Sequence, residues 1–144
     1  MTKQDRFKYR VYDKRDNKLK DILGYTFSLE FPDLVHIQWA NGTYEASIFL
    51  KDLILIQCTG LKDKNGKLIY EGDILFEDWK NEVFLNGKKW VVKWNNNHAN
   101  FYIEIINASK NAIFNQWHLA RHDLDYEIIG NAYENPEILE REVK

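Results

Sequence analysis

Residues 34–48 read LVHIQWANGTYEASI, two runs of alternating side chains on either side of an Asn-Gly pair. In the first run Val35, Ile37 and Trp39 fall on one side of an extended chain, as expected for a half-buried strand. The pair Asn41-Gly42 supplies two residues that tolerate positive φ, which a tight turn of type I′ requires. This stretch therefore predicts a β-hairpin.

The same period of two continues outward along most of the chain. Near the N-terminus Phe7, Tyr9 and Val11 share one face of a predicted strand, and a polar turn over 13–18 follows it. The other segments expected as strands are 23–31, interrupted by Gly24; 53–56, apolar on both faces; 73–76, directly after Gly72; 83–92, a second hairpin around Asn86-Gly87; 90–94 and 101–105, joined by a reversal at 95–97; and 126–131.

Two segments are compatible with short helices. One covers 111–122, and a clearer one covers 135–141. In the second, Asn135 can accept a backbone N–H as the N-cap, and Pro136 suits the first helical position. So many short strands at close spacing predict a mainly β fold built from small barrels, with one or two short helices.

The composition is that of an ordinary globular domain. The chain has 144 residues, of which 44% are hydrophobic and 29% charged, so wholesale disorder is excluded. Its apolar runs are only a few residues long and its start is polar, so neither a membrane partner nor a secretory signal is expected. The single cysteine, Cys58, cannot form an internal disulfide, which suits a cytoplasmic location.

Charge is unevenly distributed along the sequence. Residues 1–20 carry eight Lys and Arg against three acids, whereas residues 123–144 carry seven acids against two bases. The two ends could attract each other, within a chain or between copies, but exposed charge pairs contribute little, so the simpler interpretation is two solvated ends. The net charge of −2 does not favour binding to nucleic acid, which needs a broad positive surface.

The segment over 57–74 reads QCTGLKDKNGKLIYEGDI and resembles the hallmark of the YopX family of bacteriophage and prophage proteins. Three further pieces resemble the family in order: RFKYRVYDK at 6–14, WVVKW at 90–94 and IIGNAYENPE at 128–137. Tyr12 stands where the family commonly has Trp, and Cys58 where an aromatic residue is frequent. The resemblance covers essentially the whole chain.

This resemblance implies a phage or prophage origin, and with it the cytosol of a bacterial host. It also implies a β-rich fold with a small SH3-like barrel in the C-terminal half. We therefore expect an N-terminal β segment over 1–58 and an SH3-like β-barrel region over 59–144. The family brings no accepted activity, cofactor or catalytic residue, so the function has to be argued from the residues themselves.

The segment over 57–74 also has its own physical interpretation. Gly60 and Gly66 allow positive φ, Gly72 permits a tight reversal, and Asp73 can accept backbone N–H groups across it, so the segment predicts a bent hairpin with Tyr70 in the core or at its rim. In the competing interpretation, charged side chains crowd one exposed loop as a ligand site. These residues are Lys62, Asp63, Lys64, Lys67, Glu71 and Asp73.

Nothing in the sequence forms a convincing catalytic constellation, and no cofactor is expected. His118 and His122 would share one face of a helix, and Asp123 or Asp125 could add a metal ligand. However, position 119 is Leu119 and not the glutamate of a zinc protease, so no metal site is expected. Cys58 follows an apolar strand without any nucleophile signature, so it is expected to be an inert buried residue.

Aromatic residues make up 15% of the chain. Trp90 and Trp94 share one face of a predicted strand and lie opposite Phe101 and Tyr102 on the next one. Such rings could stack on unpaired bases, with the lysines nearby meeting phosphates. They could equally form the core that a small protein needs, which is the favoured interpretation. The lysines concerned are Lys88, Lys89 and Lys93.

These observations together predict a non-catalytic, self-associating protein-binding module. We expect a homo-oligomer, with a host or phage protein as a possible further partner, because strand edges of small β folds pair readily. The alternatives are a small barrel that binds single-stranded nucleic acid and, with little support, a metal-dependent hydrolase around His118 and His122. The residues proposed for a binding surface are Lys62, Asp63, Lys64, Lys67, Glu71, Asp73, Lys88, Lys93 and Trp94.

Overall fold

The structure is a computed structural model, and it describes residues 5–77, 88–107, 116–119 and 126–140. The elements in chain order are η1 (Asp5–Phe7), β1 (Tyr9–Asp13), β2 (Lys18–Phe27), β3 (Leu34–Trp39), β4 (Tyr44–Phe49), η2 (Leu50–Asp52), β5 (Leu53–Lys62), β6 (Leu68–Tyr70), β7 (Asp73–Glu77), β8 (Lys88–Asn95), β9 (Asn100–Ile105), β10 (Gln116–His118), β11 (Tyr126–Asn131) and η3 (Pro136–Leu139). The η elements are 3-10 helices, and the described residues contain no α-helix.

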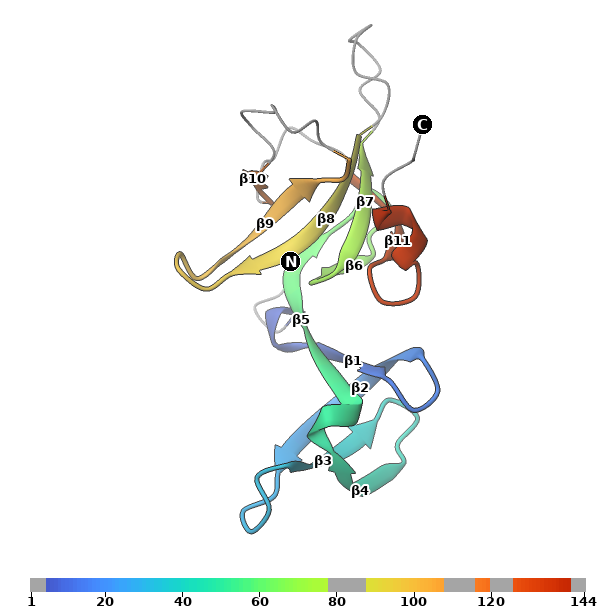
Figure 1. The fold of residues 1–144 in the computed structure, drawn as a ribbon, viewed down its shortest axis with the longest axis vertical. Coiled ribbons are helices and arrows are strands. Elements are labelled where there is room, and N and C mark those ends of the chain that lie inside the picture. Colours follow the sequence, from blue (N-terminus) through green and yellow to red (C-terminus); the bar gives the residue numbers. More distant parts are fainter. Residues whose placement is uncertain (1–4, 78–87, 108–115, 120–125, 141–144) are drawn as a thin grey trace, which may run out of the picture.

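The strands form two antiparallel sheets at opposite ends of the long axis of the molecule (Figure 1). A six-stranded sheet has the order β4-β3-β2-β1-β5-β6, and a five-stranded sheet has the order β10-β9-β8-β7-β11. The long strand β5 extends from the lower end of the molecule toward the five-stranded sheet, and within the six-stranded sheet its first half pairs with β1 and its second half with β6. The predicted mainly β class is confirmed.

The predicted closed barrel is not found among the described strands. A barrel closes only when its first and last strands pair with each other. Here β10 pairs with β9, and β11 pairs with β7, so these two strands are the open edges of the five-stranded sheet. The predicted division at residue 58 stays a prediction, and β5 runs across that position. No described helix is long and apolar enough to cross a membrane.

The hairpin at 34–48 is confirmed, with a different turn. Val35 and Ile37 are fully buried, together with Val11, Ile48 and Leu53, in the core of the six-stranded sheet. In the turn only Gly42 has positive φ, at 87°, and its N–H donates to the carbonyl of Trp39. The type I′ prediction was wrong because the loop is one residue longer: the Trp39 N–H donates to the Thr43 carbonyl.

The first two strands differ from their predicted bounds. β1 begins at Tyr9, because Phe7 ends the 3-10 helix η1 and is exposed. β2 begins at Lys18 and continues to Phe27, so it is longer than the predicted segment over 23–31. Gly24 interrupts the strand as predicted, and a register shift against β3 lies between Ile22 and Gly24. Such a bulge bends the strand without ending it.

The second core lies on the five-stranded sheet. The predicted strands at 73–76, 90–94, 101–105 and 126–131 are all present, and β8 and β9 reverse at the predicted place. The Asn86-Gly87 turn lies outside the described residues, but β7 and β8 pair directly with each other. The buried side chains of this core are Ile69, Leu75, Trp90, Val92, Ile103, Leu119 and Tyr126.

The two helix predictions have different outcomes. Within 111–122 the described residues Gln116–His118 form a strand paired to β9, so a helix there is wrong at these positions. The second segment forms the 3-10 helix η3, with Pro136 at its start as predicted. Asn135 does not cap it: its Oδ1 accepts the Asn131 N–H at 3.2 Å, across the turn that follows β11.

Candidate functional site

The predicted loop site around Asp63 is a folded turn. Asp63 is only 7% exposed, and its Oδ1 accepts the N–H groups of Asn65 and Lys67 at 2.9 Å each. Its Oδ2 accepts the Ile128 N–H at 3.1 Å, so the carboxylate fixes the β5–β6 turn against β11. Because both oxygens are used inside the chain, Asp63 is a structural residue.

The next turn, between β6 and β7, has the predicted geometry. Gly72 has φ of 86°, and Asp73 Oδ2 accepts the Tyr70 N–H at 2.8 Å. Asp73 is 2% exposed, and burial raises its pKa from 3.8 to about 6. Burial also raises the pKa of the neighbouring Glu71 carboxyl. The interpretation of this segment as a bent hairpin is therefore supported at Gly72 and Asp73.

The lysines of the same segment lie on its outside. Lys62, Lys64 and Lys67 are exposed, and the Nζ of Lys64 lies 3.3 Å from the Glu127 carboxylate. The six charged residues singled out at 62–73 therefore occupy two successive turns, with the aspartates turned inward and the lysines outward. They do not share one exposed loop.

The remaining residues of the predicted surface lie on β8, in the other sheet. Lys88 is opposite Glu77 in the strand register, and the Nζ of Lys93 is 3.2 Å from Glu104. Trp94 is 37% exposed and meets Phe101 edge to face, with ring centroids 4.8 Å apart. Trp94 of the predicted surface is therefore accessible, as are the exposed lysines of the 62–67 segment.

Trp90 belongs to the core. Sequence analysis favoured this role for the aromatic residues over stacking on unpaired bases. Trp90 is 3% exposed, and its indole N–H donates to Oε2 of the buried Glu77 at 3.0 Å. Trp90 and Trp94 share a strand face, yet only Trp94 reaches the solvent. The difference follows from their neighbours, because Trp90 packs within the buried cluster and Trp94 lies near the end of the strand.

Cys58 has the surroundings of a structural residue. It is fully buried, and its Sγ accepts the Gly60 N–H at 3.3 Å. Burial raises the pKa of the thiol, which lowers the fraction of reactive thiolate. Both properties favour the predicted inert role.

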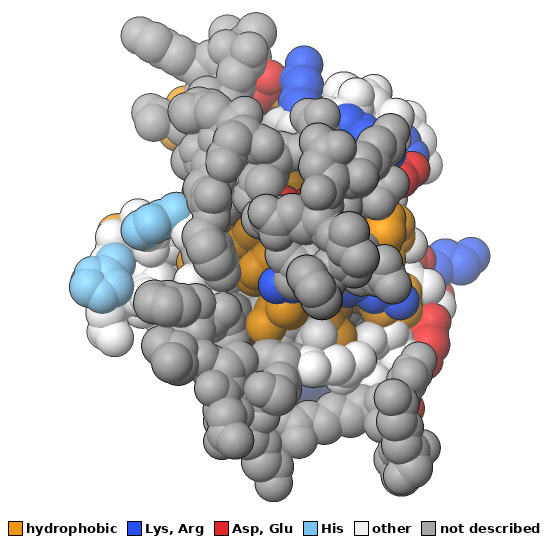
Figure 2. All heavy atoms as spheres, turned by 90° about the horizontal axis from the view of Figure 1, so that it is seen from above, with side chains coloured by type: hydrophobic (Ala, Val, Ile, Leu, Met, Phe, Trp, Pro, Cys, Tyr) orange, Lys and Arg blue, Asp and Glu red, His pale blue; other side chains and the backbone are white. Residues whose placement is uncertain are grey.

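The prediction that His118 and His122 share one face of a helix is wrong at His118. This residue lies on β10, and its Nδ1 is 3.1 Å from Nδ2 of Asn100; His122 lies outside the described residues. Figure 2 shows histidine side chains at one margin of the molecule, while most of the acidic side chains in that view lie elsewhere. Within the described part of the chain, no group of three or more His, Cys, Asp or Glu could hold a metal ion.

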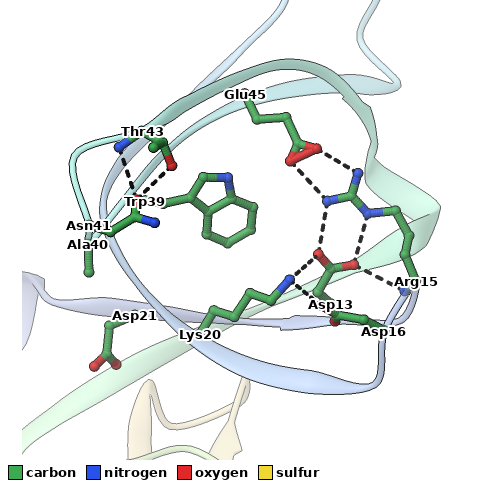
Figure 3. Close-up of a pocket in the computed structure, with 10 residues that line it drawn as sticks. All are labelled: Asp13, Arg15, Asp16, Lys20, Asp21, Trp39, Ala40, Asn41, Thr43 and Glu45. Carbon is green, nitrogen blue, oxygen red and sulfur yellow. Dashed lines mark hydrogen bonds and ion pairs between the residues drawn. The ribbon is translucent and has the colours of Figure 1, made fainter.

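Sequence analysis did not find a charged cavity of about 540 Å³ on the six-stranded sheet (Figure 3). Asp13, at the end of β1, is 1% exposed and lies at one side of the cavity, beside Arg15 and Lys20. The Nε and Nη2 atoms of Arg15 donate hydrogen bonds to the two carboxylate oxygens of Asp13, at 2.9 Å each. The same guanidinium donates two further hydrogen bonds to Glu45 on β4. Lys20 lies 3.0 Å from Asp13 and 2.6 Å from Asp16.

This network is internally satisfied. The hydrogen bonds from Arg15 hold the pKa of Asp13 well below its ordinary value, and hydrogen bonding to Asp13 raises the pKa of Arg15. The Lys20 ammonium lies 5.2 Å from the ring centre of Trp39, which forms part of the wall. The network links the β1–β2 turn to β4 through side-chain hydrogen bonds.

A second feature that the sequence analysis missed is an apolar surface at one end of the six-stranded sheet. It consists of large side chains at the end of β2 and in the β2–β3 loop that are at least half exposed, and we call it the apolar tip: Phe27 (51%), Leu29 (102%) and Phe31 (59%). The loop between β2 and β3 carries it at the lower end of the molecule (Figure 1). The run FSLEFP at 27–32 overlaps the segment predicted as a strand over 23–31, whereas β2 ends at Phe27 and leaves Leu29 and Phe31 in the following loop.

The fold and these surfaces define the class: a two-sheet antiparallel β protein with buried turn aspartates and an exposed apolar tip. Comparison with known proteins then identifies the family. The family model described as YopX protein matches residues 8–140. The chain therefore belongs to the YopX family.

Two solved structures are similar over nearly the full length. Protein EF1440 from Enterococcus faecalis has 25% sequence identity and a TM-score of 0.55, with 92% of this chain and 97% of that chain covered. Protein yopX from Bacillus subtilis has 19% identity and a TM-score of 0.60, with 94% and 99% covered. A search of curated proteins found no match. The likeness to yopX supports the fold alone.

Proposed function

We propose that this YopX-family chain is a non-catalytic binding protein that associates with a second copy of itself. The family resemblance and the single cysteine lead us to place this association in the cytosol of a bacterium that carries a phage or prophage. Other host or phage proteins are further partners of the same surface. The observation that carries the proposal is the apolar tip.

The tip is unusual because large apolar side chains gather there without cover. Leu29 is fully exposed, and Phe31 two residues later is 59% exposed. Single exposed apolar residues are ordinary, but a contiguous group marks an interaction site. Fully burying one such side chain stabilises a complex by about 1.5–3 kcal/mol, so a few of them can drive association.

Attraction between the charged ends of the chain does not contribute to this proposal. The described bases near the N-terminus pair close by: Arg10 with Asp21, and Arg15 with Asp13 and Glu45. Arg10 and Arg15 are therefore already paired within the chain and do not serve as partners for the acidic C-terminal end.

Sedimentation velocity over a hundredfold range of protein concentration tests the proposal. The wild-type chain is expected to form dimers or larger species as concentration rises. Leu29→Asp/Phe31→Asp is expected to stay monomeric at every concentration, because each aspartate would have to be desolvated on burial. Ile129→Asp is the matched control, since Ile129 is 39% exposed on the other sheet. A monomeric wild-type chain contradicts the proposal.

A second candidate function, binding of single-stranded nucleic acid, is favoured by one observation, the exposed pair of Trp94 and Phe101. Against it, Lys93 beside the pair is bound to Glu104. Gel shift with short single-stranded DNA and RNA at low and high salt tests this candidate. Binding that weakens steeply with salt and is lost in Trp94→Ala supports it, and no shift at low salt excludes it.

A further inference from the structure

A groove of about 800 Å³ lies where the two sheets approach each other, and it is the larger of the two cavities described here. Its walls come from β1 and β2 on one side and from the β5–β6 turn, β6 and β11 on the other. Three of its apolar lining residues are Leu23, Leu68 and Ile128, and Leu23 is 64% exposed. Its volume is within the range of about 300–1,000 Å³ that binding clefts span.

The charged residues that line the groove give it a positive balance. They are Lys8, Arg10 and Lys67 against Asp21 alone. Arg10 is fixed by Asp21 at 3.1 Å, and its guanidinium carbon lies 3.9 Å from the centre of the Tyr70 ring. Lys67 is exposed and forms no ion pair with any described residue. An acidic group entering the groove would therefore meet an available ammonium.

The loop that carries the apolar tip has the complementary properties. Between its apolar side chains it exposes Glu30 and Asp33, and residues 27–34 contain no base. The loop is held in one shape by three hydrogen bonds: Ser28 N–H to the Leu34 carbonyl at 3.0 Å, Leu34 N–H to the Phe31 carbonyl at 2.9 Å, and Phe31 N–H to Ser28 Oγ at 3.2 Å. A preordered loop loses little entropy on binding.

From this complementarity of apolar surface and charge, we propose that the tip of one copy enters the groove of a second copy, with Leu29 and Phe31 against the apolar wall and Glu30 facing Lys67. A chain cannot seat its own tip, because β2 continues from Leu23 in the groove to Phe27 and carries the tip away by about 3.3 Å per residue. This inference rests on the proposed self-association and names its two surfaces. Contacts between two different surfaces lead to rings or open chains of copies.

A mixing experiment tests whether the apolar tip of one copy enters the groove of another. The tip-blocked variant is Leu29→Asp/Phe31→Asp, and the groove-blocked variant is Leu23→Asp/Lys67→Asp, which changes only exposed positions. Each is expected to be monomeric alone in sedimentation velocity, with a dissociation constant for self-association at least tenfold higher than that of the wild type. An equimolar mixture is expected to form a 1:1 dimer and nothing larger, because one intact tip then meets one intact groove. Circular dichroism and thermal melting verify that both variants fold.

The possible failures are distinguishable. If the wild-type chain is monomeric, both the proposed function and this inference are wrong. If tip-blocked chains are monomeric but groove-blocked chains associate like wild type, the tips contact each other, and only this inference is overturned. Association that persists in both variants overturns the inference and moves the interface elsewhere, while self-association itself remains.

A charge exchange examines the contact between Glu30 and Lys67 directly. Glu30→Lys and Lys67→Glu are each expected to weaken association about threefold to tenfold, because like charges then face each other across the interface. The chain that carries both substitutions is expected to regain wild-type association. Equal weakening in the double variant, without recovery, contradicts the proposed pairing.

Discussion

Two turns of this protein bury an aspartate to an exposure of 2% or less, one in each region of the molecule. Asp13 ends β1 in the six-stranded sheet and is 1% exposed, and Asp73 begins β7 at the junction with the five-stranded sheet and is 2% exposed. Asp13 accepts hydrogen bonds from Arg15 and Lys20, whereas the Oδ2 of Asp73 accepts one backbone N–H. The nearest cation to Asp73 is Arg10, at 3.9 Å.

The pKa values of these two carboxyls move in opposite directions as a result. Cations beside Asp13 stabilise its charged form and hold its pKa far below the ordinary value. Around Asp73 desolvation is the dominant cause, and it raises the pKa to about 6. Burial alone therefore does not decide how a turn aspartate behaves; the charge placed beside it does. The consequences for stability differ in size and in sign.

Loss of the Asp13 carboxylate should be the largest effect. In Asp13→Asn the guanidinium of Arg15 and the ammonium of Lys20 lose their shared buried partner, and the free energy of unfolding is expected to fall by about 3 kcal/mol. Urea denaturation at pH 7 measures it. Asp16→Asn is the control: Asp16 also pairs with Lys20 but is 41% exposed, so its loss should cost less than about 0.5 kcal/mol. Equal losses of unfolding free energy in Asp13→Asn and Asp16→Asn would show that the buried position of Asp13 adds nothing to its ion pairs.

The turn at Asp73 should be sensitive to backbone shape more than to charge. Gly72→Ala introduces a Cβ at positive φ and 2.5 Å from Cε2 of Tyr133, whose ring is stacked on Tyr12. We expect a loss of about 2–3 kcal/mol in the free energy of unfolding, from backbone strain and overpacking together.

Gly66→Ala separates the two causes of that loss. Gly66 has φ of 81°, but nothing lies within 4 Å of a Cβ built there. This variant should lose about 1 kcal/mol, from backbone strain alone. Urea denaturation of the two variants side by side gives the contribution of the contact with Tyr133. An equal loss in both would show that the ring moves aside at no cost.

The same two turns show which parts of the structure the sequence can predict. The Asp73 turn was predicted because every group in it, from Tyr70 to Asp73, lies within four residues. Local patterns likewise predicted the hairpin at 34–48 and strands β7, β8, β9 and β11 of the five-stranded sheet, whereas β10 lies in a segment predicted as a helix. The Asp13 network was not predicted, because Glu45 reaches Arg15 from 30 residues away, and only the packing of β4 beside β3 brings them together.

The surfaces proposed here for self-association were the hardest part to predict. The sequence analysis selected charged residues such as Asp63, which the fold uses to accept backbone N–H groups. Leu29 and Phe31 were not selected, because they fell within the segment predicted as a strand over 23–31, where apolar residues are expected to be buried. The groove joins residues from β2 with residues from β11, a juxtaposition that no local pattern contains.

The smallest expected effect is on the pH dependence of the free energy of unfolding. The contributions of Asp13 and Asp73 to this dependence have opposite signs. Because the folded-state pKa of Asp73, about 6, exceeds the ordinary 3.8, the folded chain binds more protons than the unfolded chain between these values. Lowering the pH from 7 to 5 should therefore increase stability by about 1 kcal/mol through this group, and that gain is lost as pH rises through 6. Asp13 contributes no change in this window, since its stabilisation is lost only as pH falls below 3.8.

Chemical denaturation of the wild-type chain and of Asp73→Asn at pH 7 and pH 5 isolates this contribution. The asparagine keeps an acceptor for the Tyr70 N–H but cannot titrate. The wild-type chain should gain about 1 kcal/mol more than the variant between the two pH values. Burial raises the pKa of Glu71 as well, but that contribution is common to both chains and cancels in the difference. If the two chains respond alike, Asp73 remains ionised throughout, and the contrast between its surroundings and those of Asp13 is smaller than their burial indicates.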